Sequence, residues 1–198
     1  MMEKILDNLG IDYKIGIGEA AFYGPKLDIQ IKNVFGKEDT LITIQIDQML
    51  AEKFGMEYTA CDGSKKNPCI IHRTSIGCYE RTLALLIEKY AGAFPTWLAP
   101  TQVQIIPVSE KHFEYASELK SKLIDAGIRV EADMRNEKLG YKIREAQMSK
   151  VPYMIIAGDK EVEEKTVSVR SRKNGDLGAK SYGEFLSLIK EEIETRAL

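Results

Sequence analysis

The sequence predicts an α/β fold in the C-terminal half of the chain, preceded by a separate strand-rich domain. After residue 100, short apolar runs alternate with amphipathic helical patterns, which is typical of a mainly parallel sheet. Gly127 follows the first of these helical patterns, where a glycine commonly ends a helix. Pro95 and Pro100 bracket an apolar stretch at which the pattern changes, since proline interrupts regular structure. We place the boundary between residues 98 and 99.

Each element of the second domain follows from its periodicity. Buried strands are expected at residues 103–108, 128–132, 153–157 and 166–170. Helices are expected at residues 110–126, 139–149 and 182–196, each with apolar side chains at helical spacing on one face.

The first domain contains alternating strands. Residues 27–33 and 40–47 alternate apolar and polar side chains, as half-buried strands do, and residues 33–38 between them predict a hairpin. A third strand is expected at residues 68–72. A helix is expected at residues 79–90, with Leu83, Leu86, Ile87 and Tyr90 on one face. Another helical pattern opens the chain.

The composition is that of a globular protein without a membrane segment. The 198 residues are 44% hydrophobic and 29% charged, and the formal net charge is −2. This charge argues against bulk electrostatic capture of nucleic acid but leaves room for a local basic face. Three cysteines without a CxxC pair give no disulfide framework, so a reducing, cytoplasmic setting is expected. No apolar run reaches the length of a bilayer span.

Polar side chains follow three strands of the second domain. The first group consists of Arg135, Lys138, Lys142 and Arg144. Residues 158–161 and 169–173 form the other two groups. In an open α/β sheet ligands bind at the carboxyl ends of strands, and side chains of these types can read unpaired bases. The alternative is a solvated helix face with Asp133, Glu137 and Glu145 as ion-pair partners.

Four motifs in this half resemble the anticodon-binding domain of class II aminoacyl-tRNA synthetases. They are GIRV (127–130), RNEKLG (135–140), VPYM (151–154) and GDKEV (158–162). The resemblance implies a mixed sheet with helices on both faces. It also implies that Asn136, Glu161 and Arg170 contact anticodon bases, because these side chains can bond base edges.

Motifs in the first domain are similar to the threonyl-tRNA synthetase family. They are AFYGPKLD (21–28), TIQID (43–47), IHR (71–73), GCYER (77–81) and FPTWLAP (94–100). The resemblance covers nearly the whole chain. It implies that residues 1–98 are the C-terminal portion of an antiparallel-sheet α+β catalytic domain, with class II motif 3, and that residues 99–198 are the anticodon-binding domain.

The same resemblance assigns roles in forming threonyl-adenylate and charging threonine tRNA. Arg81 matches the motif 3 arginine that holds ATP phosphate, and Tyr23 and Gln45 match residues of the threonyl-adenylate pocket. His72 matches one of three ligands of a zinc ion that binds threonine. Two positions depart from the family pattern: Cys78, where serine or threonine is common, and Ile42, where a small residue is usual.

The family's first part of the catalytic domain, with motifs 1 and 2 and two zinc ligands, does not precede residue 23. We therefore expect a truncated chain that binds tRNA weakly, is inactive alone and holds neither zinc nor Mg-ATP firmly. The sheet edge left open predicts a homodimer or some disorder in residues 1–75. The expected partners are threonine tRNA, with threonine and ATP in the complete enzyme.

Three alternatives remain at this point. The chain could be a non-catalytic RNA- or protein-binding factor built on an anticodon-binding domain. It could be a remnant of a prolyl or histidyl synthetase, which the context of His72 disfavours. A flavodoxin-like module binding a small anion would show no base selectivity at Asn136, Glu161 and Arg170.

Overall fold

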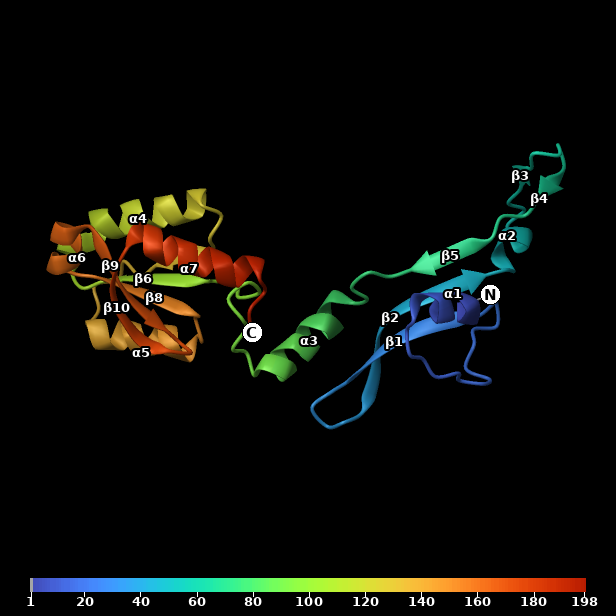
Figure 1. Ribbon diagram of the computed structural model, residues 1–198, viewed down its shortest axis with the longest axis horizontal. Coiled ribbons are helices and arrows are strands. Elements are labelled where there is room, and N and C mark those ends of the chain that lie inside the picture. The colour runs from blue at the N-terminus through green and yellow to red at the C-terminus, as the bar shows by residue number, and fades with distance from the viewer. Residues whose placement is uncertain (1) are drawn as a thin grey trace. The chain divides into compact units, whose positions relative to one another are not determined.

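The computed structural model describes residues 2–198, and the chain divides into two compact units, Met1–Lys89 and Tyr90–Leu198 (Figure 1). We call these the first unit and the second unit. The division lies earlier than the boundary expected between residues 98 and 99.

The connecting segment, residues 91–99, packs with the second unit, and this explains the shift. Thr96 donates its hydroxyl to Glu192 at 2.8 Å, and the guanidinium of Arg172 donates to the carbonyl of Phe94 at 2.6 Å. The buried amide of Gln102 donates to the carbonyl of Thr96 at 2.9 Å. Backbone groups of the segment therefore find their partners in the C-terminal half, as buried polar groups must.

The first unit contains a three-stranded antiparallel sheet in the order β1-β2-β5. Its strands are β1 (Lys26–Lys32), β2 (Glu38–Asp47) and β5 (Ile70–Arg73). The hairpin between β1 and β2 turns at Asn33, whose side-chain oxygen accepts the N–H groups of Phe35 and Lys37. The three expected strands are confirmed, and none of their bounds is shifted by more than two residues.

The remaining elements of the first unit are short, apart from its last helix. They are α1 (Met2–Leu9), α2 (Leu50–Lys53), β3 (Tyr58–Thr59), β4 (Lys65–Lys66) and α3 (Tyr79–Tyr90). The helix α3 has the expected bounds, but Leu83 and Ile87 on its apolar face are exposed.

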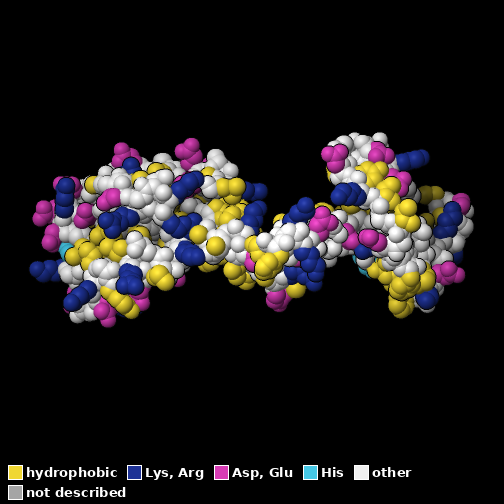
Figure 2. Space-filling view, turned by 90° about the horizontal axis from the view of Figure 1, so that it is seen from below, with side chains coloured by type: hydrophobic (Ala, Val, Ile, Leu, Met, Phe, Trp, Pro, Cys, Tyr) yellow, Lys and Arg dark blue, Asp and Glu magenta, His cyan; other side chains and the backbone are white. Residues whose placement is uncertain are grey.

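Few side chains of the first unit are buried. Among residues 2–89 these are Leu6, Asp47 and Ala51. Figure 2 shows hydrophobic side chains at the surface of this unit among charged ones. One of these three buried residues is thus the aspartate Asp47, although a carboxylate is rarely buried without hydrogen-bond partners.

The second unit is built on a five-stranded mixed sheet in the order β10-β9-β8-β6-β7. The strands are β6 (Val103–Pro107), β7 (Val130–Ala132), β8 (Tyr153–Ala157), β9 (Thr166–Ser171) and β10 (Gly175–Ser181). The strand β6 pairs parallel with β7 and β8, whereas β9 is antiparallel to both β8 and β10. The sheet therefore has as many antiparallel as parallel pairs.

Helices cover both faces of this sheet, as the resemblance implied (Figure 1). They are α4 (Phe113–Asp125), which follows a short 3-10 turn at Glu110–His112, α5 (Leu139–Met148), α6 (Asp159–Glu164) and α7 (Tyr182–Glu194). The helices α4 and α7 cover one face of the sheet, and Leu123 and Phe185 belong to the core between these helices and the strands. The helix α5 covers part of the other face, where Ala146 packs against Ile106 and Met154.

None of the helices in residues 2–198 is long and apolar enough to cross a bilayer.

Candidate functional site

Three of the residues expected to act in the first unit lie together. The hydroxyl of Tyr23 donates to Oε1 of Gln45 at 2.6 Å. Gln45 on β2 is opposite His72 on β5 in the strand register, and paired residues of neighbouring strands face the same side. The rings of Tyr23 and His72 meet edge to face with centroids 5.9 Å apart. The structure thus brings Tyr23, Gln45 and His72 into one group.

The segment carrying Tyr23 is held against β2 by its backbone. The carbonyl of Tyr23 accepts the N–H of Gln48 at 3.0 Å, and that of Pro25 accepts the N–H of Ile46 at 3.0 Å. Gly24, between them, has φ +154°, and a Cβ there would lie 2.0 Å from the carbonyl oxygen of Ile46. Only glycine allows this approach, so the Tyr-Gly-Pro sequence itself places the Tyr23 ring beside the sheet.

Asp47 completes this group, although sequence reasoning did not single it out. Its side chain is fully buried, and Oδ2 lies 3.0 Å from Nε2 of His72. Oδ1 accepts the backbone N–H groups of Met49 at 3.0 Å and Leu50 at 2.9 Å. Burial raises the pKa of the Asp47 carboxyl, but the bonds from His72, Leu50 and Met49 outweigh burial and hold the pKa below its usual range.

The described residues do not form a complete catalytic zinc site. No three side chains of the types His, Cys, Asp and Glu come together within residues 2–198 in a way that could hold a metal, and a catalytic zinc needs three protein ligands. The three cysteines are free and exposed. Among the described residues, His72 therefore has no companion ligands with which to hold a zinc ion.

Arg81 lies apart from the Tyr23 group. It belongs to α3, and its Nη1 donates to the carbonyl of Thr40 at 3.3 Å, five residues before Gln45 on β2. Together with Asn33, Asp39 and other residues it lines a small cavity of about 120 Å³. Arg81 makes no ion pair with Glu80 or Glu88 among the described residues, so its charge is not neutralised by either neighbour on the helix.

The thiol of Cys78, one of the two departures from the family pattern, donates to Oε2 of Glu80 at 2.9 Å. This bond holds the pKa of the Glu80 carboxyl below its usual range.

In the second unit, Asn136 and Glu161 follow the carboxyl ends of β7 and β8. The amide nitrogen of Asn136 donates to Oε1 of Glu110 at 2.9 Å, and Glu110 follows the end of β6. Oε2 of Glu161 accepts the N–H of Gly158 at 2.9 Å, which fixes the first turn of α6. Two of the three expected base-contacting residues therefore emerge at one edge of the sheet. Glu110 was missed from sequence.

Arg170 does not emerge at that edge. The prediction that Asn136, Glu161 and Arg170 lie together at neighbouring strand ends is therefore wrong for Arg170. Because β9 runs antiparallel to β8, Arg170 lies beside Met154, near the start of β8. It is about 10 Å from the carboxyl end of that strand, at about 3.3 Å per residue. Met154 belongs to the core under α5, so Arg170 occupies the α5 face of the sheet. Its Nη2 is 3.8 Å from Asp176.

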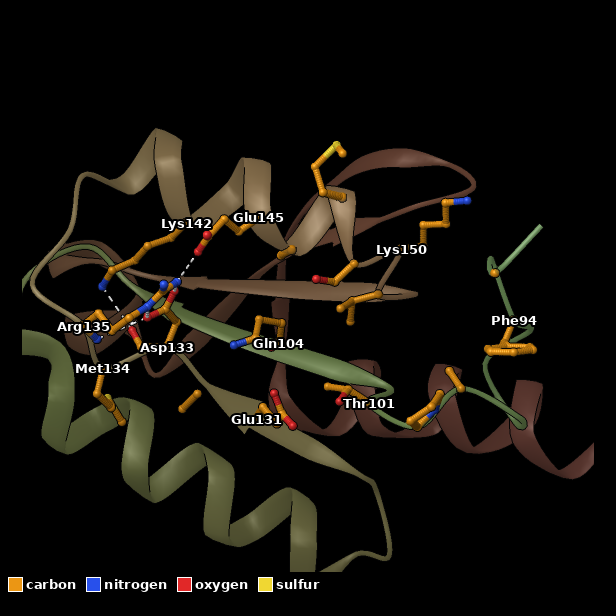
Figure 3. A pocket seen from close by; sticks show the side chains of 18 residues that line it. Phe94, Thr101, Gln104, Glu131, Asp133, Met134, Arg135, Lys142, Glu145 and Lys150 are labelled. Atoms are coloured by element: carbon orange, nitrogen blue, oxygen red, sulfur yellow. Dashed lines mark hydrogen bonds and ion pairs between the residues drawn. The ribbon is translucent and has the colours of Figure 1, made fainter. Parts of the chain in front are cut away.

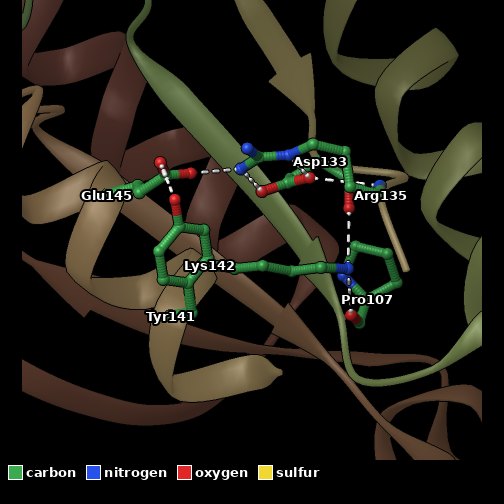
Figure 4. A network of polar contacts seen from close by, with 6 residues as sticks. All are labelled: Pro107, Asp133, Arg135, Tyr141, Lys142 and Glu145. Carbon is green, nitrogen blue, oxygen red and sulfur yellow. Dashed lines mark hydrogen bonds and ion pairs between the residues drawn. The ribbon is translucent and has the colours of Figure 1, made fainter. Parts of the chain in front are cut away.

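Two of the four basic residues predicted at the start of α5, Arg135 and Lys142, are paired or buried (Figure 4), whereas Lys138 and Arg144 are exposed. Arg135 donates Nε and Nη2 to Asp133 at 2.8 and 2.6 Å and also pairs with Glu145. These bonds hold the pKa of Asp133 below its usual range. Lys142 is 2% exposed and donates to the carbonyls of Asp133 at 3.1 Å and Pro107 at 3.4 Å. For Arg135 the ion-pair alternative is confirmed.

A pocket of about 940 Å³ opens on the α5 face of the second unit (Figure 3). Arg135, Asp133 and Glu145 line one part of it, and Gln104 on β6 and Glu131 on β7 line the floor. Its polar lining carries both signs of charge, so it does not select an anion by charge alone. No signal in the sequence pointed to it, because its walls come from segments far apart along the chain.

His112, unlike His72, is buried, and it lies at the same edge as Asn136. Its Nδ1 accepts the N–H of Ser109 at 3.2 Å, and its Nε2 is 2.9 Å from Oδ1 of Asp159. These bonds connect the loop after β6 with the start of α6. The bond to His112 holds the pKa of Asp159 below its usual range.

Comparison with known proteins gives both units a family. Residues 102–192 match the model of the anticodon binding domain, and residues 1–90 match that of the tRNA synthetase class II core domain (G, H, P, S and T). The chain is 60% identical over 196 residues to a threonine–tRNA ligase of Clostridium perfringens, covering 99% of this chain and 30% of the relative. It is 57% identical over 195 residues to that of Clostridium botulinum, covering 98% and 30%.

A solved structure shows the same arrangement of elements. The crystal structure of the RNA binding domain of threonyl-tRNA synthetase from Cryptosporidium parvum Iowa II is 31% identical, with a TM-score of 0.83 over 96% of this chain and 48% of that one. The chain spans about 30% of the length of the curated relatives it matches. It belongs to the threonyl-tRNA synthetase family and corresponds to the C-terminal region, the end of the class II core domain followed by the anticodon-binding domain.

Proposed function

We propose that the second unit of this chain reads the anticodon of threonine tRNA and that the first unit supplies part of a threonyl-adenylate pocket. The observation that carries the proposal is identity of 57–60% to threonine–tRNA ligases over almost every residue of the chain. The activity is threonine–tRNA ligation, in which threonine and ATP form threonyl-adenylate and the threonyl group passes to tRNA.

Anticodon reading rests on Asn136, Glu161 and Arg170. Glu110 takes one hydrogen of the Asn136 amide, which leaves the other hydrogen and the oxygen for a base edge. Glu161 uses Oε2 to hold Gly158, so Oε1 is left to accept an exocyclic amine. Arg170 lies on the α5 face, so an RNA loop that contacts all three residues crosses from the carboxyl edge onto this face.

The adenylate pocket rests on Tyr23, Gln45, His72 and Arg81. Tyr23 and Gln45 are already bonded to each other, which fixes both side chains for contact with the adenylate. Arg81 has no carboxylate partner among the described residues and is available for a phosphate. In the complete enzyme, Mg-ATP would supply the phosphoryl groups, and His72 would be one of the ligands of a zinc ion that binds threonine. We place the enzyme in the cytoplasm.

Binding of tRNA tests the first half of the proposal. The chain is titrated into threonine tRNA and into the same tRNA altered only in the anticodon, at one salt concentration, because phosphate contacts make affinity salt-dependent. A preference of about 5-fold or more for the native anticodon is expected, since one good pair of base contacts contributes about 1–3 kcal/mol. Equal affinity refutes anticodon reading and favours a general binding factor.

Pyrophosphate exchange tests the second half. We expect no threonine-dependent ATP–pyrophosphate exchange by this chain alone, because residues 2–198 give His72 no companion metal ligands. Threonine-dependent turnover would contradict that expectation. Arg81→Gln and Gln45→Ala in a full-length ligase of the family are expected to lower exchange, whereas the control substitution Lys53→Gln, at an exposed residue of α2, is not.

A further inference from the structure

The buried ring of His112 joins two segments at the edge of the second unit from which Asn136 and Glu161 emerge. The side chain is 4% exposed and belongs to the short turn between β6 and α4. One segment is the loop after β6, where Glu110 accepts the amide of Asn136 at 2.9 Å. The other is the start of α6, the helix that carries Glu161.

The hydrogen-bond roles of the ring are fixed by its neighbours. The backbone N–H of Ser109 can only donate, so Nδ1 of His112, 3.2 Å away, is the acceptor. In the neutral ring the proton is then on Nε2, which donates to Oδ1 of Asp159 at 2.9 Å. Each nitrogen thus holds one segment, Nδ1 the loop after β6 and Nε2 the first residue of α6.

The helix α6 is not held in place by apolar burial. It has six residues, and none of them is buried, whereas packing of an apolar face supplies most of the stability of a helix in a protein. Its first turn is closed internally, since Glu161 accepts the N–H of Gly158 at 2.9 Å. Among residues 2–198, the contact between Asp159 and His112 is the one hydrogen bond that a side chain of α6 makes with another element.

We propose that His112 is a positioning residue for anticodon reading, which holds Glu161 at a set distance from Asn136 through its bond to Asp159. Without this bond the start of α6 is free to shift, and Oε1 of Glu161 no longer meets an exocyclic amine in a set place. The inference rests on the proposed role of Asn136 and Glu161 in reading bases, and it adds the residue that fixes their spacing.

The bond can be removed at Asp159 without opening the interior. The side chain of Asp159 is 87% exposed, so Asp159→Ala leaves no cavity. Asp159→Asn removes the same charge but keeps an oxygen that accepts from Nε2 of His112. The asparagine variant therefore separates the hydrogen bond from the charge, which by itself changes the affinity for any RNA. Glu163→Ala, at an exposed position of α6, is the control for loss of a carboxylate from the same helix.

The readout is discrimination at each anticodon position. The full chain is titrated, at one salt concentration, into threonine tRNA and into three variants that each differ at one anticodon base. Glu161→Ala identifies the base that Glu161 reads, and Asn136→Ala identifies the base that Asn136 reads. Asp159→Ala is expected to lower discrimination at the base of Glu161 by about 3-fold or more, within the ~5-fold or greater effect of one good pair of base contacts. Discrimination at the base of Asn136 should stay, and Asp159→Asn and Glu163→Ala should keep both.

His112 itself is replaced in a second pair of variants. In His112→Asn the side chain keeps an acceptor for Ser109 but is too short to reach Asp159. In His112→Gln the amide nitrogen is as many bonds from Cβ as Nε2 of histidine, so it can still donate to Asp159. His112→Asn is expected to lose the same discrimination as Asp159→Ala, with no further loss in the double variant, and His112→Gln is expected to retain it. If these variants do not fold, the variants of Asp159 decide.

Amide hydrogen exchange tests the positioning without RNA. The N–H of Val162 donates to the carbonyl of Gly158 at 3.1 Å, and it exchanges faster when the start of α6 opens. Asp159→Ala is expected to raise this rate, and Asp159→Asn is expected to leave it unchanged.

Four results overturn the proposal: full discrimination in Asp159→Ala, an equal loss at every anticodon position, a loss in Asp159→Asn as large as in Asp159→Ala, or an unchanged exchange rate of Val162 in Asp159→Ala. Equal affinity of the wild type for all four tRNAs refutes the proposed function, and this inference with it. Discrimination that is present in the wild type and survives Asp159→Ala refutes this inference alone.

Discussion

Replacing Gln102 by glutamate should make the free energy of unfolding of the second unit depend on pH. Gln102 is 1% exposed, and both ends of its amide are bonded to backbone. Oε1 accepts the N–H of Arg129 at 2.9 Å, and Nε2 donates to the carbonyl of Thr96 at 2.9 Å. In Gln102→Glu one oxygen can still accept from Arg129, but the other faces the carbonyl of Thr96, so two acceptors meet.

The magnitude follows from that mismatch. An unsatisfied buried acceptor costs about 1–3 kcal/mol, and a charged one more, so we expect a loss of about 3 kcal/mol at neutral pH. This corresponds to about two pKa units, which raises the pKa of the introduced carboxyl from about 4.3 unfolded to about 6.5 folded. Below about pH 4.3 the protonated carboxyl donates to Thr96 and the loss disappears. It develops fully above about pH 6.5.

The assay is urea unfolding followed by the fluorescence of Trp97, the only tryptophan of the chain, in the segment that Gln102 anchors. Gln104→Glu on β6 is the matched control, because the side chain of Gln104 lines the open pocket and makes no hydrogen bond among the described residues. It should change stability little at any pH. Equal stability of Gln102→Glu and wild type at neutral pH would refute the reasoning.

Three further predictions concern the second unit. Phe185→Ala should lower the free energy of unfolding by about 3–5 kcal/mol, measured by urea titration, because its ring is fully buried. Glu110→Ala should weaken the preference for the native anticodon in the tRNA titration and should have no further effect in Asn136→Ala, because Glu110 acts through Asn136. Asp133→Asn should destabilise the chain at neutral pH. Since the pKa of Asp133 is lowered by Arg135, the difference from wild type should be full above about pH 4 and vanish as pH falls further.

The periodic parts of the fold could be predicted from sequence, because burial on one face leaves a repeating pattern. The strand β8 has the predicted bounds, and α7 differs by two residues at its end. The strand β10 was missed because residues 175–181 include two glycines and no apolar alternation. The hydrogen bonds of β10 to β9 hold this segment as a strand, although its own side chains are mostly exposed. The helix α6 was missed because its six residues are mostly charged.

The direction of β9 could have been predicted and was not. Residues 158–165 separate β8 from β9, whereas a parallel connection needs a dozen or more residues. This argument would have placed Arg170 away from the edge that carries Asn136. By contrast, no pattern could reveal Asp47, since a polar residue at a strand end is usually solvated and its burial depends on α2 and β5 packing around it.

The ammonium group of Lys142 has a consequence for the proposed reading of the anticodon that reaches beyond its own burial. It bridges the carbonyls of Pro107 and Asp133, the points from which the loops with Glu110 and Asn136 start. These loops are therefore tethered at a set spacing before any RNA arrives. A surface ordered in advance loses less conformational entropy on association, so the rigidity provided by one interior cation should lower the entropic cost of docking a flexible RNA hairpin.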